Sequence, residues 1–350
     1  MFFASDNTSG VPEPVLKALA ATNEGFAPGY GADAPMERVR DRIREVFEAP
    51  EAAVYLVATG TAANSLAIAT YAQPWSQVWC HRNAHIAEDE CNAPEFFSGG
   101  AKLALLEGAH ARIDPEGLAE ALASAPEGVH HAQPGLLSLT NLTERAARYS
   151  VAEIARLAGI AKAHGLPVHL DGARFANALV AEGCTPAEMT WKAGVDVLSF
   201  GGTKNGLLGV EAVVLFDPSR AWEFELRRKR GGHLFSKHRF LSAQMEAYLT
   251  DDLWLTLART ANARAETLEA GLREAGARLV HPRGGNILFA EFPLKAHAAL
   301  RAAGAAYYDW PAPPPAGAGP EHMHQCRLVC SWSTPEADVE RFIAILKDAL

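Results

Sequence analysis

The sequence has no long hydrophobic run and little cysteine. No uninterrupted apolar stretch among its 350 residues reaches the roughly 18 residues of a membrane-spanning helix, so we expect no membrane association. The opening MFFASDNTSG lacks a basic segment followed by an apolar one, so we also expect no signal peptide. The five cysteines are odd in number and scattered along the chain, which fits a protein of the reducing cytoplasm better than a disulfide scaffold.

Positive charge is also scarce. The formal net charge is -9, and the one basic cluster, RRKRGG at 227–232, is too short to outweigh it. Proteins that bind nucleic acids need a basic face, so we expect no nucleic-acid partner. Apolar residues, by contrast, make up 49% of the 350 positions, which is enough for one large domain and a smaller one.

Short apolar runs alternate with helical patterns in the first two thirds of the chain. The runs are continuously apolar, as in strands that are covered on both faces. They lie at 52–57, 77–80, 136–140, 167–171, 195–200 and 211–216, and helical patterns at 61–72, 151–165 and 173–183 lie between them. Strand, helix and strand in repetition predict an α/β fold whose mostly parallel sheet is flanked by helices.

The last third of the chain has a different character. Residues 236–275 read as nearly all helical and could link two domains. Strand patterns at 278–282, 286–292 and 326–332 follow, with helical patterns near 295–303 and 335–350. These patterns predict a small C-terminal α+β domain. We therefore divide the chain into an N-terminal segment (1–11), a large domain (12–250) and a small domain (251–350).

Three stretches place polar residues at the ends of predicted strands, where ligands bind in open α/β sheets. The first is VATGTAAN at 57–64, in which Gly60 allows a tight turn and Thr59 or Thr61 could cap the helix that follows. Free N–H groups and the positive end of the helix dipole suit a phosphate group. An ordinary capped helix would give the same pattern.

The second stretch is HLDGARFANAL at 169–179. Asp171 ends a strand where Gly172 turns the chain, so its carboxylate could pair with a ligand cation or a protonated ring nitrogen. Arg174 could bind an anion through two parallel hydrogen bonds. The alternative is a local pair between Asp171 and Arg174 that caps a helix.

The third stretch is LSFGGTKNG at 198–206. Lys204 lies between two apolar runs, and burying an ammonium group is costly unless it is paired or neutralised. A lysine that loses its proton in apolar surroundings is a nucleophile. The alternative is a lysine that reaches solvent from a turn. Taken together, a phosphate cradle, a carboxylate at a strand end and a lysine match what pyridoxal phosphate requires: Lys204 would form the Schiff base, and Asp171 would keep the pyridine nitrogen protonated.

Longer blocks of the sequence resemble the low-specificity L-threonine aldolases, which are fold-type I pyridoxal-phosphate enzymes with the aminotransferase-like fold. The most specific blocks are CHRNAHIAEDECNAPEFFSGGAKL (80–103), VHLDGARFANALV (168–180) and SFGGTKNG (199–206), and the resemblance extends over nearly the whole chain. It implies retro-aldol cleavage of L-threonine, L-allo-threonine and related β-hydroxy-α-amino acids such as phenylserine to glycine and an aldehyde. It also implies a homotetramer or dimer with shared active sites.

The resemblance further implies roles for single residues. Lys204 and Asp171 would act on the cofactor as inferred above, and His85 would stack on its ring and serve as the catalytic base, with His130 as the second candidate. The other implied contacts are Gly60, Thr61, Arg174 and Lys237 for the cofactor, and Ser5, Tyr30, Arg174 and Arg327 for the substrate. Of these, Arg327 would come from the small domain, and Tyr30 and Lys237 from a neighbouring subunit.

Two stretches depart from the family pattern, and a third resembles a metal site. RGGHLFSK stands where many relatives have GGGMR, so the cationic phosphate contact from the neighbour falls to Lys237 or Arg230. TNLTERAARY stands where many have ENTHNG, which leaves the contacts of that loop open. HMHQCRLVC at 322–330 has the look of a metal-ligand pattern, but we expect no metal, because Arg327 already explains the segment. A β-eliminating lyase, an aminotransferase and a non-catalytic relative stay as alternative functions.

Overall fold

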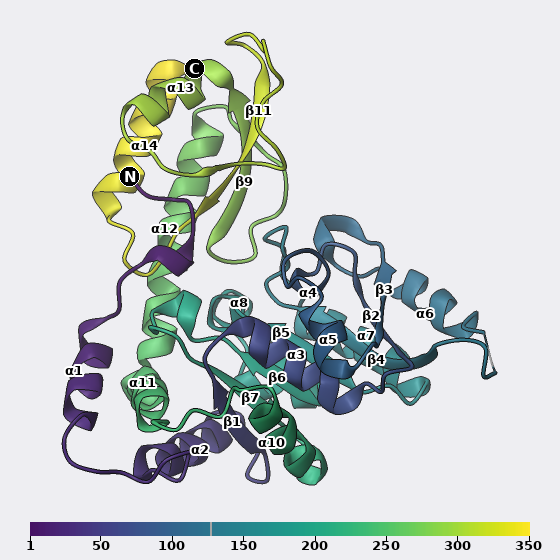
Figure 1. The fold of residues 1–350 in the computed structure, drawn as a ribbon. Helices are drawn as coiled ribbons and strands as arrows, with labels where there is room; N and C mark the ends of the chain where they lie inside the picture. Colours follow the sequence, from purple (N-terminus) through teal and green to yellow (C-terminus); the bar gives the residue numbers. More distant parts are fainter. Residues whose placement is uncertain (127) are drawn as a thin grey trace.

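The computed structural model describes residues 1–126 and 128–350, which form two sheets that each carry their own helices (Figure 1). The strands are β1 (Ala53–Val57), β2 (Ser76–His81), β3 (Lys102–Leu106), β4 (Gln133–Thr140), β5 (Val168–Gly172), β6 (Val197–Phe200), β7 (Glu211–Leu215), β8 (Arg278–Leu279), β9 (Ile287–Pro293), β10 (Tyr308–Asp309) and β11 (Met323–Val329). The helices are α1 (Glu13–Thr22), α2 (Ala34–Val46), α3 (Gly60–Tyr71), α4 (His85–Glu88), α5 (Ala93–Ser98), α6 (Pro115–Ala123), α7 (Val151–Ala163), α8 (Phe175–Glu182), α9 (Pro186–Met189), α10 (Ala221–Arg230), α11 (Arg239–Leu249), α12 (Leu253–Glu274), α13 (Leu294–Ala302) and α14 (Glu336–Ala349). Two of the short 3-10 helices matter below: η1 (Asp6–Thr8) and η4 (Thr203–Asn205).

The large sheet has seven strands in the order β1-β7-β6-β5-β4-β2-β3. Strands β2 to β6 run parallel to one another, and β7 runs antiparallel to both of its neighbours, β1 and β6. The predicted fold class is therefore confirmed. Because β7 is reversed, its first residue, Glu211, pairs with Val57, the last residue of β1. Glu211 thus lies at the edge of the sheet where the parallel strands end.

Both faces of this sheet are covered, which explains why its strands read as continuously apolar. One face packs against α3 and α10 through residues such as Val57, Leu66 and Val213. The other packs against helices that include α2, α7 and α8, through residues such as Leu170 and Val214. The sequence patterns did not predict β3, which lies at the sheet edge with only its last residue buried and so lacks the continuous apolar character of its neighbours.

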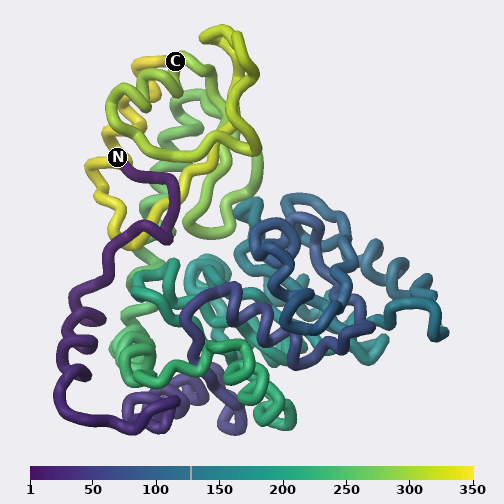
Figure 2. The backbone as a smooth tube through the Cα atoms, viewed as in Figure 1, coloured from purple at the N-terminus to yellow at the C-terminus, as the bar shows by residue number. Residues whose placement is uncertain are grey.

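The small C-terminal sheet is antiparallel, in the order β10-β11-β9-β8. Its core joins β9 and β11 to α14 and to the second half of α12. The first half of α12 packs in the core of the large domain through Trp254 and Leu257, so this one helix contributes to both cores. The first residues of the chain also belong to the small domain: Phe3 is buried in its core, and the chain then runs down to α1 (Figure 2).

The described part of the chain contains no helix that is both long and apolar enough to cross a bilayer. All five of its cysteines are free thiols, and Cys80, Cys326 and Cys330 are buried. Burial raises the pKa of the Cys80 and Cys330 thiols to about 12, so these side chains stay neutral and pack as small apolar groups.

Candidate active site

A cavity of about 240 Å³ lies at the edge of the large sheet where the parallel strands end. It is lined by the start of α3, by the end of β5, by η4 with the start of β7, by the stretch from His85 to Glu90, and by η1 of the N-terminal segment. Lys204, Asp171, His85, Gly60 and Thr61 all face it. The structure therefore brings together five of the residues singled out in the sequence, although they are spread over 145 positions of the chain.

Asp171 is the carboxylate at the end of β5. It is 2% exposed, and its two oxygens are held separately: Oδ1 accepts a hydrogen bond from the backbone N–H of Ala173 at 3.0 Å, and Oδ2 accepts one from Nδ2 of Asn64 on α3 at 3.0 Å. Gly172 is required at the turn that follows, because a Cβ there would lie 2.8 Å from the carbonyl oxygen of Ser199. The carboxylate is thus fixed in place at the floor of the cavity.

A buried polar chain links Asp171 to His85. Nδ2 of Asn64 also donates to Oε1 of Glu90 at 2.9 Å, and Nδ1 of His85 lies 2.8 Å from the same Glu90 oxygen. A carboxylate can only accept, so in its neutral form His85 carries its proton on Nδ1 and leaves Nε2 as the free ring nitrogen. Neither Asn64 nor Glu90 was predicted. The available signal for Asn64 was an amide side chain in the largely apolar TAANSLAIA stretch.

Two opposing effects set the acidity of this pair. Burial alone would lower the pKa of His85, but the hydrogen bond that His85 donates to Glu90 and the negative charges of Glu144 and Asp171 outweigh it, so the pKa of His85 is raised. Burial raises the pKa of Glu90. The structure therefore holds His85 in one orientation and favours its protonated form more than free histidine does.

Lys204 lies in η4, immediately after β6, and is partly buried rather than enclosed in the core. The two preceding glycines let the backbone pass close to its neighbours, since a Cβ on Gly201 would lie 2.4 Å from the carbonyl oxygen of Ala173. Asn205 anchors the other side by donating to the hydroxyl of Tyr248 at 2.7 Å and to the carbonyl of Trp254 at 2.8 Å. Lys204 can therefore lie between two buried strands because its side chain faces a cavity and its backbone is held in a tight turn.

Glu211 is a second carboxylate that the sequence did not single out. It lines the same cavity, is 7% exposed, and its Oε2 accepts a hydrogen bond from the backbone N–H of Gly202 at 2.6 Å. Burial raises its pKa to about 6, although the Gly202 hydrogen bond and the charge of Lys204 work in the opposite direction. This carboxyl therefore ionises less readily than an ordinary glutamate.

The start of α3 forms another wall of the cavity. Thr59 is the N-cap, and its Oγ1 accepts a hydrogen bond from the backbone N–H of Ala62 at 3.1 Å. Gly60 and Thr61 follow and line the cavity. The stretch is thus an ordinary capped helix, and its amino end also points at the space beside Lys204, where an anion would meet the positive end of the helix dipole.

The two arginines lie beside this cavity without lining it. Arg174 is 7% exposed and forms two parallel hydrogen bonds with Asp6, from Nε to Oδ2 at 2.7 Å and from Nη2 to Oδ1 at 2.9 Å. The local pair with Asp171 that the sequence left open is therefore not formed. Arg327 comes from β11 of the small domain, and its Nη2 donates to the backbone carbonyl of Ala4 at 3.2 Å. Ser5 lies between these two contacts, where its Oγ accepts from the N–H of Asn7 at 3.2 Å.

Three other predicted residues lie farther from this cavity within one chain. His130 is exposed on a turn before β4, and β4 separates it from the cavity edge by its whole length, roughly 23 Å at about 3.3 Å per residue. Tyr30 is 55% exposed, and Lys237 is exposed near the start of α11. Of the two histidines predicted as bases, only His85 is at the site.

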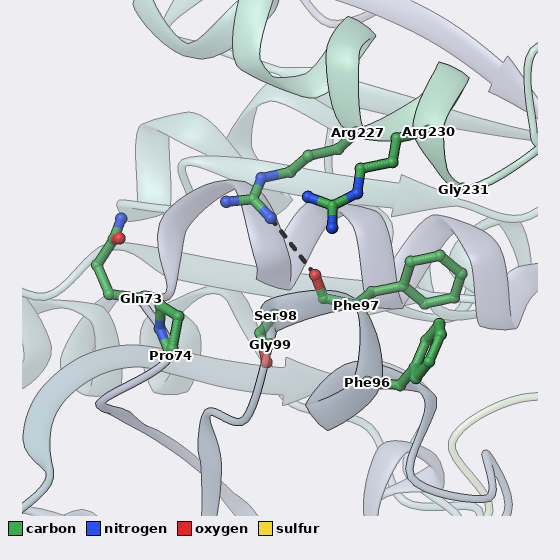
Figure 3. Close-up of a pocket in the computed structure, with 9 residues that line it drawn as sticks. All are labelled: Gln73, Pro74, Phe96, Phe97, Ser98, Gly99, Arg227, Arg230 and Gly231. Atoms are coloured by element: carbon green, nitrogen blue, oxygen red, sulfur yellow. Dashed lines mark hydrogen bonds between the residues drawn. The ribbon is translucent and has the colours of Figure 1, made fainter.

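Arg230, the alternative to Lys237, lines a separate cavity of about 570 Å³ between α5 and α10 (Figure 3). Phe96, Phe97 and Arg227 also line it, and Nη1 of Arg227 reaches the carbonyl oxygen of Phe97 at 3.4 Å. This cavity is larger than the one at Lys204, but Gln73 and Pro74, which follow the far end of α3, help to line it. It therefore lies away from the helix start that borders Lys204.

The residues around the smaller cavity fit pyridoxal phosphate. A lysine, a fixed carboxylate and a helix start surround one space, and two buried atoms there, Oδ1 of Asn64 and Oε2 of Glu90, have no hydrogen-bond partner among the described residues. Within the described ranges 1–126 and 128–350, no group of three His, Cys, Asp or Glu side chains could hold a metal ion.

Comparison with known proteins gives the same picture. A family model described as beta-eliminating lyase matches residues 3–293. The low specificity L-threonine aldolase of Pseudomonas aeruginosa is 39% identical over 347 residues, which cover 99% of this chain and 96% of that protein. The enzyme of the same name from a Pseudomonas sp. strain is 38% identical over 346 residues, with the same coverage.

Solved structures agree with these sequence relatives. A structure described as Leishmania major threonine aldolase superposes with a TM-score of 0.92 at 28% identity, covering 99% of this chain and 98% of that one. Sphingomonas wittichii serine palmitoyltransferase superposes with a TM-score of 0.73 at 18% identity, covering 100% of this chain and 86% of that one, which shows a shared fold alone.

Proposed function

This chain belongs to the beta-eliminating lyase family, and on that premise we propose that it is an aldehyde-lyase that uses pyridoxal 5′-phosphate to cleave L-threonine to glycine and acetaldehyde. The proposal extends to L-allo-threonine and to related β-hydroxy-α-amino acids such as phenylserine. The observation that carries it is the single cavity in which Lys204, Asp171, His85 and the start of α3 meet. Full-length similarity to two L-threonine aldolases supports the choice of reaction.

The cofactor contacts follow from the chemistry of each group. Lys204 would be the amine that holds the cofactor through its aldehyde, and Asp171, which accepts a hydrogen bond from Asn64, would keep the ring nitrogen protonated. The N–H groups at Gly60 and Thr61, at the start of α3, would hold its phosphate. Bound pyridoxal phosphate supplies an electron sink for the pair released when the Cα–Cβ bond of the substrate breaks.

His85 is the residue that we assign as the base. Its Nδ1–H is fixed on Glu90, so the free Nε2 can take the proton of the substrate β-hydroxyl. A raised pKa means that His85 reaches its neutral, proton-accepting form only at a higher pH than free histidine. Arg174, Arg327 and Ser5 lie together on the side of the N-terminal segment and are assigned to the substrate carboxylate.

We further propose a homotetramer or dimer in which each site is completed by a second copy. Tyr30, Arg230 and Lys237 are exposed and lie away from the Lys204 cavity of their own chain, which is the placement that contacts to a neighbouring site require. Any contribution of His130 would have to come from a second copy in the same way. Exposed aromatic side chains such as Phe26 and Phe96 support an interface with a second copy. The scattered free thiols support a cytoplasmic location.

Aldehyde release tests the proposed function directly. The cofactor-loaded protein and a Lys204→Ala variant would be incubated with L-threonine, L-allo-threonine, D-threonine and L-phenylserine. Acetaldehyde or benzaldehyde together with glycine, formed from the L-isomers only and lost in the variant, is the expected result. Pyruvate with ammonia, or a keto acid, in place of aldehyde would show elimination or transamination instead. No product from any substrate would point to a non-catalytic relative.

A further inference from the structure

The N-terminal segment starts at the small domain and runs down to α1 (Figure 2), and its Asn7 lines the cavity. Its first residues are fixed to the small domain: the N–H of Phe3 donates to the carbonyl of Ala306 at 2.7 Å, and the N–H of Val329 donates to the carbonyl of Phe3 at 2.8 Å. Phe3 is fully buried and packs edge-on against Phe342, with ring centroids 5.2 Å apart. The segment is therefore a structural part of the small domain that reaches the site of the large one.

Asp6 is the point where three parts of the chain meet. It is 1% exposed, and its carboxylate accepts two hydrogen bonds from Arg174, at the start of α8 in the large domain. Its Oδ2 also accepts one from Nδ2 of Asn286, next to β9 of the small domain, at 3.0 Å. The same Asn286 nitrogen donates to the carbonyl of Cys330 at 2.8 Å. Burial works against the ionised form, but the charge and hydrogen bonds of Arg174 prevail, so the pKa of Asp6 is lowered and the pair stays ionic.

The arginine of the small domain is held by the same segment. Arg327 donates from Nη2 to the carbonyl of Ala4, two residues before Asp6, and its guanidinium lies over the rings of Tyr308 and Trp310 at 5.1 and 5.3 Å. Its Nε is buried and has no hydrogen-bond partner in the described ranges. Arg174 and Arg327 thus both donate hydrogen bonds to residues 4 to 6. The position of one guanidinium relative to the other therefore depends on this stretch.

We propose that Asp6 is a positioning residue for recognition of the substrate carboxylate: it fixes Arg174 and, through Asn286 and the neighbouring Ala4 carbonyl, sets the position of Arg327 relative to it. The inference rests on the proposed function, because it takes the ligand to be an α-amino acid. Asp6 occupies Nε and Nη2 of Arg174, and Nη1, which has no hydrogen bond to the residues that the structure describes, is left for the ligand. A buried arginine without its carboxylate would lose this orientation and carry an unpaired charge.

The test compares two amines that differ in the carboxylate alone. Binding of glycine and of methylamine to the cofactor-loaded protein would be measured by calorimetry for the unaltered protein and for Asp6→Asn. We expect the dissociation constant for glycine to rise by at least about tenfold, the loss typical of a charge-assisted hydrogen bond, while that for methylamine changes by less than about twofold. In turnover, KM for L-threonine rises and kcat stays within about threefold.

Two further variants separate positioning from folding. Asp6→Glu keeps the charge but moves it by one methylene, so glycine binding weakens in the same direction and by less; this variant decides the question if Asp6→Asn does not fold. Asp114→Asn makes the same chemical change at the N-cap of α6, where Oδ2 accepts from Gly117 N–H at 2.8 Å, and leaves glycine binding unchanged.

Equal weakening of glycine and methylamine, or no weakening of either, would overturn the assignment of Asp6. Failure of the proposed function would look different, because it would show as a lack of aldehyde release by the unaltered protein. The two ideas can therefore fail separately.

Discussion

Replacing Glu211 with glutamine should make the stability of the protein without cofactor depend less on pH. Glu211 is 7% exposed, and burial raises its pKa from 4.5 to about 6. A tenfold change in proton affinity is worth about 1.4 kcal/mol, so this change corresponds to about 2 kcal/mol between the protonated and ionised forms. Glutamine keeps an oxygen that can accept the hydrogen bond from Gly202 but never ionises.

The direction in which stability changes with pH depends on whether the folded or the unfolded chain binds the Glu211 proton more tightly. The folded protein holds the Glu211 proton more strongly than the unfolded chain, so the stabilisation is fully present below pH 4.5 and is lost as the pH rises through 6. We therefore expect the unaltered protein to lose about 2 kcal/mol relative to Glu211→Gln between pH 4.5 and 7.5. Above pH 6 the variant should have the higher unfolding temperature.

Unfolding of both proteins without cofactor, followed by circular dichroism at intervals of half a pH unit, measures this difference. Glu340→Gln, an exposed change on α14, controls for the general effect of removing one negative charge. A constant difference between Glu211→Gln and the unaltered protein across the whole range would refute the reasoning. So would a difference that grows toward acid pH, since that would mean that Glu211 is stabilised as a carboxylate.

Three further changes probe the base and the turn that holds the lysine. His85→Asn should lower kcat by on the order of 10²–10⁴-fold, the range of general base catalysis, and a loss below about tenfold in steady-state kinetics would remove His85 from that role. Glu90→Gln removes the carboxylate that raises the pKa of His85, so the acid limb of the pH profile of kcat/KM should move to lower pH; an unmoved limb would show that Glu90 does not set it. Gly201→Ala places a Cβ 2.4 Å from the backbone oxygen of Ala173 and should lower both the unfolding temperature and the cofactor affinity, whereas Gly10→Ala, with nothing within 4 Å, should change neither. Equal behaviour of the two glycine variants would contradict the close approach at Gly201.

The sequence predicted those strands that are buried on both faces, because burial makes their residues apolar. Strands covered on both faces read as continuous apolar runs, and six of the seven strands of the large sheet were placed in this way, while the half-exposed β3 was missed. The order of strands and the reversal of β7 came only with the structure. They depend on which runs pair across the sheet, and no short-range pattern records that.

Some residues of the site could be predicted from the sequence and others could not, for the same reason. Lys204 and Asp171 were recognisable because each lies at the end of an apolar run, and the topology of an α/β sheet brings such ends together. Glu90 and Asp6 were not recognisable, because Asn64 and Arg174, which donate hydrogen bonds to them, are distant along the chain. The placement of His130 rested on a motif resemblance alone, and a motif does not show at which end of a strand a residue lies.

The double connection between the domains determines how they can move. α12 is a continuous helix of 22 residues, about 33 Å long at 1.5 Å per residue, and it is anchored in both cores. The N-terminal segment is a second, separate attachment. Two attachments at separate points leave the small domain free to rotate about one axis relative to the large domain. They resist sliding and twisting of one domain against the other. Motion of the small domain would therefore carry Arg327 along a single arc, while the walls of the Lys204 cavity that α3 and β5 provide stay in place.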